Sequence, residues 1–316
     1  RQLRDVYGCR VVIASGQPSL TNQYMLEEFE IVQAFYPGPG LSGDGMQALN
    51  TQIKQSDMIV FAGGGLMQDV HSTNLLEHCA YIASKARMFN KHVCAFGIGA
   101  GPVTSQKGIA LASLLGDCCD EIYFRDTYSL EYMENNVLQG KSHAQVGFDT
   151  ILLASLGTKN DGPATDKVRK IGLSVRHWKN FGLEQVTEVV KSLVEAGSRV
   201  VYMAYEKKDL LMYEELKSQF GEEISLSDES TIESTFSTIS ELDGLVSMRL
   251  HANLFAILAG VPFVALAYDN KLKTVIGSLG KGSRVLPLEA STTEMLSVLD
   301  EEDKSDPAQL QRIVGE

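Results

Sequence analysis

Short apolar runs alternate with longer amphipathic stretches along most of the chain. Short continuous apolar runs are typical of strands buried on both faces, and the stretches between them repeat their apolar positions at helical spacing. This alternation predicts an α/β protein whose parallel sheets are covered by helices. The predicted strands are 10–14, 31–36, 58–62, 92–96, 121–124, 171–175, 200–203, 245–248 and 263–266, and the predicted helices are 45–55, 75–89, 108–119, 128–135, 183–196, 210–219, 252–259 and 272–279.

A polar stretch with glycine and proline at 157–163 interrupts the alternation. The 316 residues are enough for two domains of ordinary size. We therefore expect two Rossmann-like domains, 1–156 and 157–316, facing a central cleft, with a C-terminal helix able to pack back on the first domain. Loops at the carboxyl ends of parallel strands would line this cleft and form the ligand site.

Composition narrows the choice of partners. The net charge of −12 disfavours nucleic-acid binding, which needs clustered Lys and Arg. The five cysteines form no CxxC pair, so they suit reduced, buried thiols rather than disulfides or a zinc site. No apolar run is long enough for a membrane span. Together these features predict a soluble cytoplasmic protein.

Arg249, Leu250 and His251 are the most informative residues of the chain, because they lie between a predicted strand and a predicted helix. This placement brings a guanidinium, an imidazole and free backbone N–H groups to one point, which suits an anionic ligand such as a phosphate. The alternative is structural: Arg249 would end the strand in solvent and His251 would pack in the first helical turn.

Further cations follow other strands of the same half. Arg176 comes directly after 171–175 and is followed by the only tryptophan, Trp178. Two arginines at one sheet edge can bind a dianion. Tyr268 and Lys271 follow the strand 263–266 and could extend the site, although a helix capped by Asp269 explains that cluster equally well.

Two glycine-rich segments follow strands in the first half. Gly63, Gly64 and Gly65 allow close approach of a ligand, and Asp69 is a candidate base for a hydroxyl, or else a helix cap. Gly97, Gly99 and Gly101 resemble the dinucleotide fingerprint, but Pro102 stands where its third glycine belongs. NAD and FAD are therefore not expected. Gly99 is retained as a candidate ligand contact.

Arg125 and Asp149 complete the candidates at this edge. Arg125 ends a predicted strand beside Asp126, an arrangement that fits ligand binding or a salt bridge. Asp149 either faces the cleft, as a second candidate base, or caps a short helix. The motifs for phosphate loops, nucleophile elbows, zinc proteolysis and metal-bound sugar-nucleotide transfer are absent from the sequence, so no cofactor and no metal are predicted.

Taken in order, these motifs resemble the polysaccharide pyruvyl transferase family, nearest to its CsaB-type cell-wall branch. The resemblance covers about 11–279. One departure concerns the start: family members open with a strand and an acidic NxGDE-type segment, whereas this chain starts within the following helix, at 2–6, so the first strand is expected to be missing. The matching segments are Gly63–Asp69, Gly97–Val103, Arg125–Asp126, Ser174–Arg176, Met248–Ala252, Gly260–Pro262 and Tyr268–Lys271.

The resemblance implies a GT-B-like fold and transfer of pyruvyl from phosphoenolpyruvate to a sugar, forming a cyclic ketal with phosphate release. It implies that Arg249, Leu250 and Arg176 hold phosphoenolpyruvate in the second domain, while the first domain takes the acceptor. For the CsaB branch the acceptor would be N-acetylmannosamine of a cell-wall glycan precursor, and a lipid-linked acceptor would bring peripheral contact with the inner face of the membrane. Homo-oligomer formation is left open.

Two other functions remain as alternatives at this point. A GT-B glycosyltransferase using a nucleotide sugar would share the fold, and its arginines would hold a diphosphate. A non-catalytic protein that binds anionic glycans would use the same cations without turnover. His251, with Asp69 and Asp149 as candidate bases, argues against the non-catalytic protein.

Overall fold

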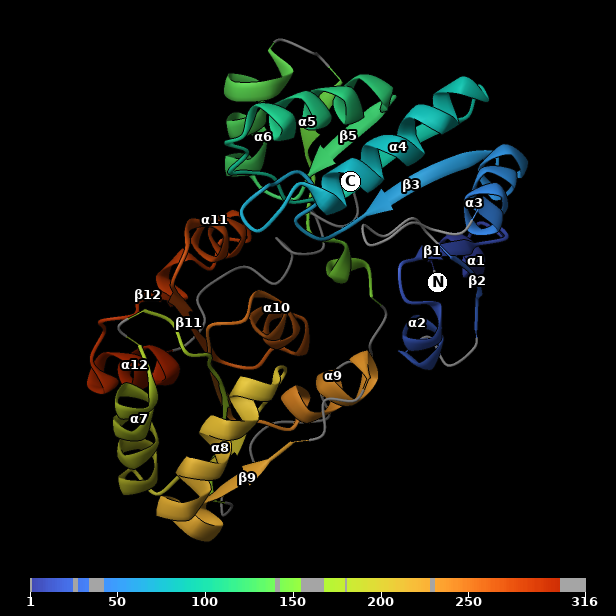
Figure 1. Cartoon of the computed structure of the whole chain (residues 1–316). Coiled ribbons are helices and arrows are strands. Elements are labelled where there is room, and N and C mark those ends of the chain that lie inside the picture. The colour runs from blue at the N-terminus through green and yellow to red at the C-terminus, as the bar shows by residue number, and fades with distance from the viewer. Residues whose placement is uncertain are drawn as a thin grey trace. The chain divides into compact units, whose positions relative to one another are not determined.

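The computed structural model describes residues 2–24, 28–33, 43–139, 143–154, 168–179, 181–227 and 231–301. The chain divides into two compact units, Arg1–Ala154 and Ser155–Glu316 (Figure 1). The polar stretch 157–163, expected between the domains, lies outside the described residues, as do 34–36 of a predicted strand. Each unit has a hydrophobic core of its own.

The first unit contains two parallel sheets in its described part. Strand β1 (Val12–Ser15) pairs with β2 (Glu30–Gln33), and a second sheet has the order β3-β4-β5-β6. The strands of the second sheet are β3 (Met58–Ala62), β4 (His92–Ile98), β5 (Glu121–Phe124) and β6 (Ala144–Val146). The helices are α1 (Gln2–Asp5), α2 (Pro18–Tyr24), α3 (Gly43–Gln55), α4 (Asn74–Met88), α5 (Gln106–Cys118), α6 (Thr127–Met133), the π-helix η1 (Glu134–Leu138) and the 3₁₀-helix η2 (Thr150–Leu153).

The second unit is one parallel sheet with the order β12-β11-β10-β7-β8-β9 among its described strands. This is the classical doubly wound order, in which the first strand lies beside the second and the fourth. The strands are β7 (Lys170–Ser174), β8 (Arg199–Tyr202), β9 (Ile224–Leu226), β10 (Gly244–Ser247), β11 (Phe263–Ala267) and β12 (Val285–Pro287). The helices are α7 (Leu183–Glu195), α8 (Lys207–Phe220), α9 (Ile232–Ser240), α10 (Leu250–Ala259), α11 (Asn270–Ser278) and α12 (Thr292–Asp300), with the 3₁₀-helices η3 (Gly221–Glu223) and η4 (Gly282–Arg284).

The two units differ at one strand position. In the second unit β7 lies between β8 and β10, whereas in the first unit no described strand joins β1 to β3. This is the position that the first strand of a doubly wound sheet would take. Strand β3 is therefore an edge strand in the described structure, and the side chains of Met58 and Val60 are exposed.

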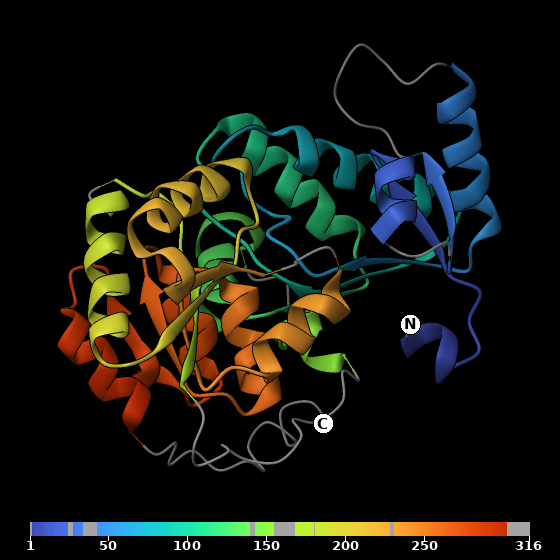
Figure 2. The same cartoon turned by 90° about the horizontal axis from the view of Figure 1, so that it is seen from below.

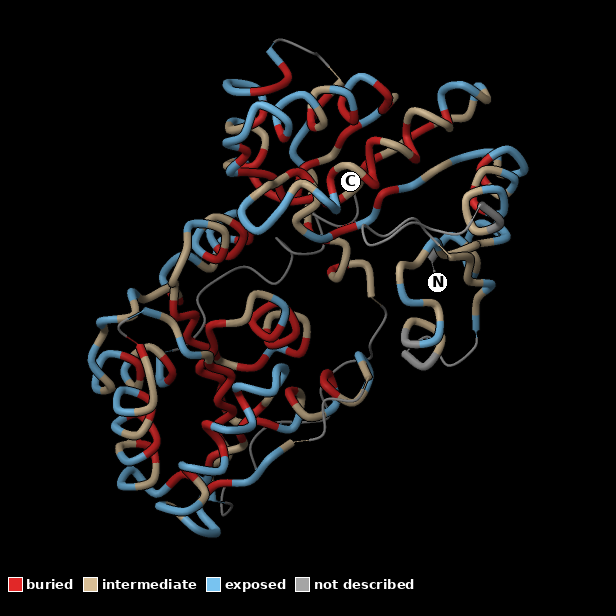
Figure 3. Tube along the Cα trace, viewed as in Figure 1, coloured by how far each residue is buried: buried red, intermediate tan, exposed pale blue. Residues whose placement is uncertain are grey.

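Helices cover the sheets as the apolar pattern predicts. In the second unit α9, α10 and α11 pack side by side, while α7 contacts α8 and α12, so that the two groups cover opposite faces of the sheet (Figures 1 and 2). Buried residues follow the strands and the inner helix faces, and exposed residues lie on the outer faces (Figure 3). The predicted α/β class with Rossmann-like units is confirmed.

Two details depart from or extend the sequence-based picture. Cys9 is exposed, which contradicts the expectation of buried thiols, whereas Cys79, Cys118 and Cys119 are buried. Burial raises the pKa of Cys79 to about 12, so this thiol stays protonated and packs as an apolar group. The last described helix, α12, packs against β10, β11 and α7 of its own unit. None of the described helices is long and apolar enough to span a bilayer.

Two glycines test the packing of the second unit. Gly172 lies in β7, where an added Cβ would overlap Leu242 and come within 2.9 Å of the Leu245 Cδ1, whereas a Cβ on Gly277 in α11 would meet nothing within 4 Å. We expect Gly172→Ala to lower the free energy of unfolding by about 1–3 kcal/mol through overpacking. Gly277→Ala is expected to raise it by about 0.5 kcal/mol, because alanine favours the helix. Equal unfolding midpoints for the two variants would contradict the packing described for β7.

Candidate functional site

The carboxyl ends of four neighbouring strands gather the charged side chains of the second unit. Arg176 follows β7, Glu206 follows β8, Arg249 follows β10 and Tyr268 follows β11. Since β8, β7, β10 and β11 are consecutive and parallel in the sheet, these residues lie along one sheet edge. The sheet topology therefore brings together Arg176, Arg249 and Tyr268, as their positions in the sequence predicted.

Arg249 is the centre of this edge. Its Nη1 lies 2.8 Å from Glu206 Oε1, and its Nη2 lies 2.6 Å from Asp209 Oδ2. Its backbone is also fixed: the amide donates to the Ser247 hydroxyl at 2.9 Å, and the carbonyl accepts from the Asn253 side chain at 2.9 Å. The guanidinium is thus held at the start of α10, where helix N–H groups add positive potential.

The carboxylates tune the electrostatics of this cluster. Burial opposes the charge of Arg249, but the hydrogen bonds and charges of Glu206 and Asp209 outweigh it and raise the pKa of Arg249 above its ordinary value. The hydrogen bond from Arg249 in turn lowers the pKa of Glu206. The Arg249 Nε is buried and has no hydrogen-bond partner among the described residues. The guanidinium therefore keeps its charge and one unused donor.

Arg176 shares one of these carboxylates. Its Nη1 lies 4.0 Å from the same Glu206 Oε1 that Arg249 binds. The guanidinium carbon is 5.5 Å from the Trp178 ring centre and 5.9 Å from that of Tyr268, and the two rings are themselves 4.8 Å apart. Burial raises the pKa of Tyr268, so its hydroxyl stays protonated and can donate a hydrogen bond. Contacts with both rings, which are tilted by 56° to each other, favour this position of Arg176.

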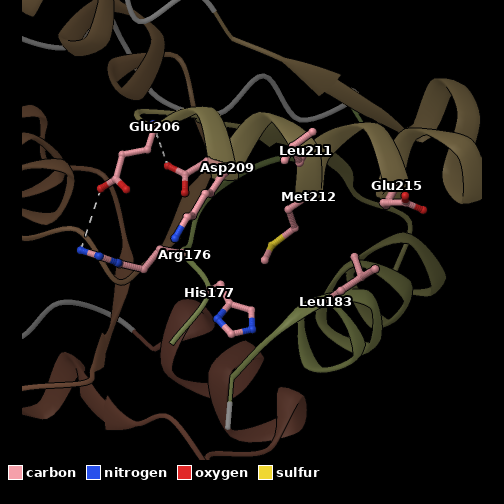
Figure 4. Close-up of a pocket in the computed structure, with 9 residues that line it drawn as sticks. Arg176, His177, Leu183, Glu206, Asp209, Leu211, Met212 and Glu215 are labelled. Carbon is pink, nitrogen blue, oxygen red and sulfur yellow. Dashed lines mark hydrogen bonds and ion pairs between the residues drawn. The ribbon is translucent and has the colours of Figure 1, made fainter. Parts of the chain in front are cut away.

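A pocket of about 480 Å³ adjoins this cluster. It is lined by the loop after β7 and by α7 and α8, with Leu183 and Met212 forming an apolar wall and His177 beside it (Figure 4). Arg176 and Glu206 stand at one side of the pocket and reach toward each other. The charged cluster is therefore bordered by an apolar surface within the same unit.

The other predicted residues of this edge lie on its helices. Leu250 and His251 are the first two residues of α10, and His251 is exposed. Lys271 lies in the first turn of α11, and Asp269 caps that helix by accepting a hydrogen bond from the Leu272 amide at 3.1 Å. The capping role weighed for Asp269 in the sequence is thus present in the structure.

Sequence reasoning missed Glu206 and Asp209. The signal was available, because Glu206 follows the predicted strand 200–203 just as Arg176 follows 171–175. The ends of parallel strands meet at one edge, so a residue there deserved the same weight as the arginines. Asp209 carried less signal, because only the first turn of α8 brings its side chain back to this edge.

The glycine segments of the first unit extend its sheet beyond the strands. Gly99 donates to the Gly64 carbonyl at 2.7 Å, and Gly101 donates to the Met67 carbonyl at 2.8 Å. Gly97 has φ of +64° at a register shift of β4, and a Cβ there would lie 2.7 Å from the Phe148 carbonyl oxygen. Positive φ at Gly64 and Gly97, with close contacts at Gly97 and Gly99, thus accounts for these glycines. Gly65 lies in the same segment and is partly exposed.

Arg125 and Asp149 form a buried ion pair in this unit. Arg125 Nη1 lies 3.1 Å from Asp149 Oδ2, and the two side chains are 6% and 2% exposed. Asp149 Oδ1 also caps η2 by accepting from the Ile151 amide. A Cβ on Gly99 would lie 2.8 Å from the Arg125 guanidinium, so the glycine leaves room for this side chain. The structural alternative weighed for Arg125 and Asp149 therefore describes their contacts.

Asp69 ties the glycine segment to α5. Its carboxylate accepts from the amides of Thr104 and Ser105 at 2.9 and 2.8 Å and from the Ser105 hydroxyl at 2.7 Å. Burial opposes its charge, but these hydrogen bonds outweigh it and lower the pKa of Asp69. A carboxylate with a lowered pKa and engaged oxygens is a weak base. Its contacts therefore fit a structural role, in which Asp69 binds the loop before α5 while Ser105 is the N-cap of that helix, better than the role of base expected from the sequence.

Within the described residues, no group of three or more His, Cys, Asp and Glu side chains is placed to hold a metal ion. The guanidiniums of Arg176 and Arg249 share the Glu206 carboxylate at the second-unit edge, and Arg249 also binds Asp209. Guanidiniums and helix N-termini are groups that can bind anions.

Comparison with known proteins gives this site its context. Residues 13–270 match the sequence profile of the polysaccharide pyruvyl transferase family. The chain belongs to this family. It is 23% identical over 286 residues to the amylovoran biosynthesis protein AmsJ of Erwinia amylovora, an alignment that covers 79% of this chain but 65% of that relative.

Solved structures show the fold. A candidate UDP-N-acetylglucosamine 2-epimerase from Listeria monocytogenes is similar with a TM-score of 0.62 and 15% identity, covering 96% of this chain and 86% of that one. The UDP-GlcNAc 2-epimerase of Methanocaldococcus jannaschii has a TM-score of 0.59 and 12% identity, with 96% and 98% covered. MurG of Acinetobacter baumannii has a TM-score of 0.53 and 13% identity, with 99% and 92% covered. The units are thus of GT-B type.

The structural role of Asp69 at the loop before α5 can be tested through pH-dependent stability. We expect Asp69→Asn to lower the free energy of unfolding by about 1–2 kcal/mol at neutral pH, because it removes the charge that the Ser105 and Thr104 donors stabilise. The folded-state pKa of Asp69 is lowered, so this stability is present above the unfolded pKa and is lost as pH falls through the folded pKa. The difference between wild type and variant should therefore shrink below about pH 4.

Asp57→Asn serves as the control, because Asp57 is exposed in the same unit. Denaturant unfolding of the three proteins at several pH values gives the comparison. A constant difference in the free energy of unfolding between wild type and Asp69→Asn across the acid range would contradict the structural role of Asp69.

Proposed function

We propose that this protein transfers the pyruvyl group of phosphoenolpyruvate to two hydroxyls of a sugar, forming a cyclic ketal and releasing phosphate. One observation carries the proposal: Arg249 and Arg176 converge on a single carboxylate oxygen, at 2.8 and 4.0 Å, at the carboxyl edge of the second unit. This edge offers paired guanidiniums for the donor, and membership of the family supports pyruvyl transfer.

The donor sets the chemical requirements. Phosphoenolpyruvate carries a carboxylate and a phosphate on one enol carbon, so its site needs two cationic groups and a proton donor for the methylene carbon. Arg176 and Arg249 supply the charges, and the Leu250 amide at the start of α10 adds a helix N-terminus. His251, exposed in the same turn, binds the phosphate or protonates the methylene.

The reaction then proceeds by addition and displacement. A proton is added to the methylene carbon, and the electron pair of the double bond forms the new C–H bond. The adjoining carbon becomes cationic and accepts one sugar hydroxyl, whose proton is lost. A second hydroxyl then attacks the same carbon, loses its proton and displaces phosphate, which leaves with the electron pair of the broken C–O bond as the ketal closes. Positive charge around the leaving phosphate stabilises the last step.

The base for the sugar hydroxyls is left unassigned. Asp69 and Asp149 were the candidates from the sequence, but their carboxylates bind the start of α5 and Arg125 respectively. The CsaB-type resemblance supports an acceptor such as N-acetylmannosamine of a cell-wall glycan precursor. Gly64, Gly65 and Gly99 remain candidate acceptor contacts, with Tyr268 and Lys271 as further contacts on the donor side.

Substitutions at the arginine edge test this proposal. Arg249→Ala and His251→Ala are expected to lower phosphate release from phosphoenolpyruvate, in the presence of a sugar acceptor, by about 100-fold or more. Arg199→Ala is the matched control, because Arg199 is exposed at the opposite end of the same sheet. Near wild-type turnover in either variant of the edge would contradict the assigned role.

Ligand-dependent thermal stability separates the donor classes. Phosphoenolpyruvate is expected to raise the unfolding midpoint in proportion to its saturation, while UDP and NAD leave it unchanged. Stabilisation by UDP alone would favour a nucleotide-sugar glycosyltransferase instead. Stabilisation by phosphoenolpyruvate without any phosphate release in the presence of sugar acceptors would favour a binding protein.

A further inference from the structure

Two carboxylates hold Arg249, and they differ in exposure and in their other hydrogen bonds. Asp209 is fixed: its side chain is 2% exposed, and its Oδ2 accepts from the amides of Tyr205 and Glu206 at 3.1 and 3.0 Å while it binds Arg249. Releasing it would leave a buried charge unpaired, which is strongly unfavourable. Asp209 therefore stays in place whether or not a ligand is bound.

Glu206 is the opposite case. Its side chain is 47% exposed, and the ion pairs that place its carboxylate are those to Arg249 and Arg176. An exposed ion pair of this kind contributes about 0–1 kcal/mol, since water solvates the separated carboxylate well. Figure 4 shows Glu206 extending from the loop before α8 toward Arg176 at the side of the pocket. Its carboxylate can leave the guanidiniums without burying a charge.

The Glu206 carboxylate lies where an anion bound by both arginines would lie. One oxygen, Oε1, approaches both guanidiniums, and the second donor face of Arg249 is taken by Asp209. An anion bound by both arginines would need the space that Glu206 now fills. The Glu206 carboxylate therefore competes with a substrate carboxylate or phosphate for the same guanidinium N–H groups.

We propose that Glu206 is an internal counter-ion that occupies the phosphoenolpyruvate site until this substrate displaces it. Asp209 is the positioning residue that holds Arg249 through the exchange. The inference rests on the proposed function in one respect: the displacing anion is phosphoenolpyruvate, or the phosphate product. The counter-ion keeps the two arginines together in the empty site, and its return helps to expel the product anion.

The two carboxylates should then have opposite effects on anion binding. Glu206→Gln removes the competitor and keeps the shape of the side chain. It is expected to lower the Kd for inorganic phosphate and the KM for phosphoenolpyruvate by about two- to fivefold, the factor that corresponds to an exposed ion pair. Asp209→Asn keeps an acceptor for the backbone amides but removes the charge that fixes Arg249, so it should weaken phosphate binding.

Titration calorimetry with inorganic phosphate measures the first effect, and steady-state phosphate release measures KM and kcat separately. Glu214→Gln is the matched control, because it removes the same charge from an exposed position on α8, the helix that follows Glu206. A competitor affects KM and product inhibition, whereas a residue of purely structural importance would change the unfolding midpoint. Should Asp209→Asn fail to fold, the Glu206→Gln comparison still decides the matter.

The outcomes separate this inference from the proposed function. Tighter phosphate binding in Glu206→Gln than in Glu214→Gln supports the counter-ion. Equal or weaker binding in Glu206→Gln, with the wild type binding phosphate and losing it on Arg249→Ala, overturns the counter-ion and leaves the donor site intact. A wild type that binds neither phosphate nor phosphoenolpyruvate overturns both.

Discussion

The ion pair between Arg249 and Asp209 is the interaction on which the arrangement of charges at the carboxyl edge of the second unit depends. Asp209 is buried and also binds two backbone amides at the start of α8, so it joins the helix that follows β8 to the residue that follows β10. Breaking such a pair from one side leaves a buried charge, which is costly. This constraint fixes one guanidinium in a unit where Arg176 and Glu206 are more exposed, and it sets the point on which an anion can bind.

The two units use their strand ends differently. In the second unit the arginines remain partly accessible, and their shared partner Glu206 is exposed. In the first unit Arg125 is paired with Asp149 in the interior, Gly99 makes room for it, and Asp69 binds the loop before α5. Similar residue types at similar topological positions are thus partly accessible in one unit and engaged in structural contacts in the other. Accessibility of the charge distinguishes the two cases.

Much of the fold could be predicted from the sequence. The apolar runs at 171–175 and 263–266 overlap β7 and β11, because buried parallel strands need continuous apolar residues. Short edge strands such as β9 and β12 escaped prediction, since their apolar runs are brief and partly exposed. The arginines at the carboxyl edge of the second unit could be found because strand ends converge. Asp69 and Asp149 could be named from the sequence as candidates, but sequence spacing cannot show whether a carboxylate is already bound to backbone amides or to an arginine.

A crystal structure with phosphoenolpyruvate tests most directly whether the donor displaces Glu206. We predict that the donor binds Arg249 and Arg176, with the Asp209 contact retained and Glu206 withdrawn from both guanidiniums. Donor density elsewhere, with Glu206 still paired to Arg249, would contradict it.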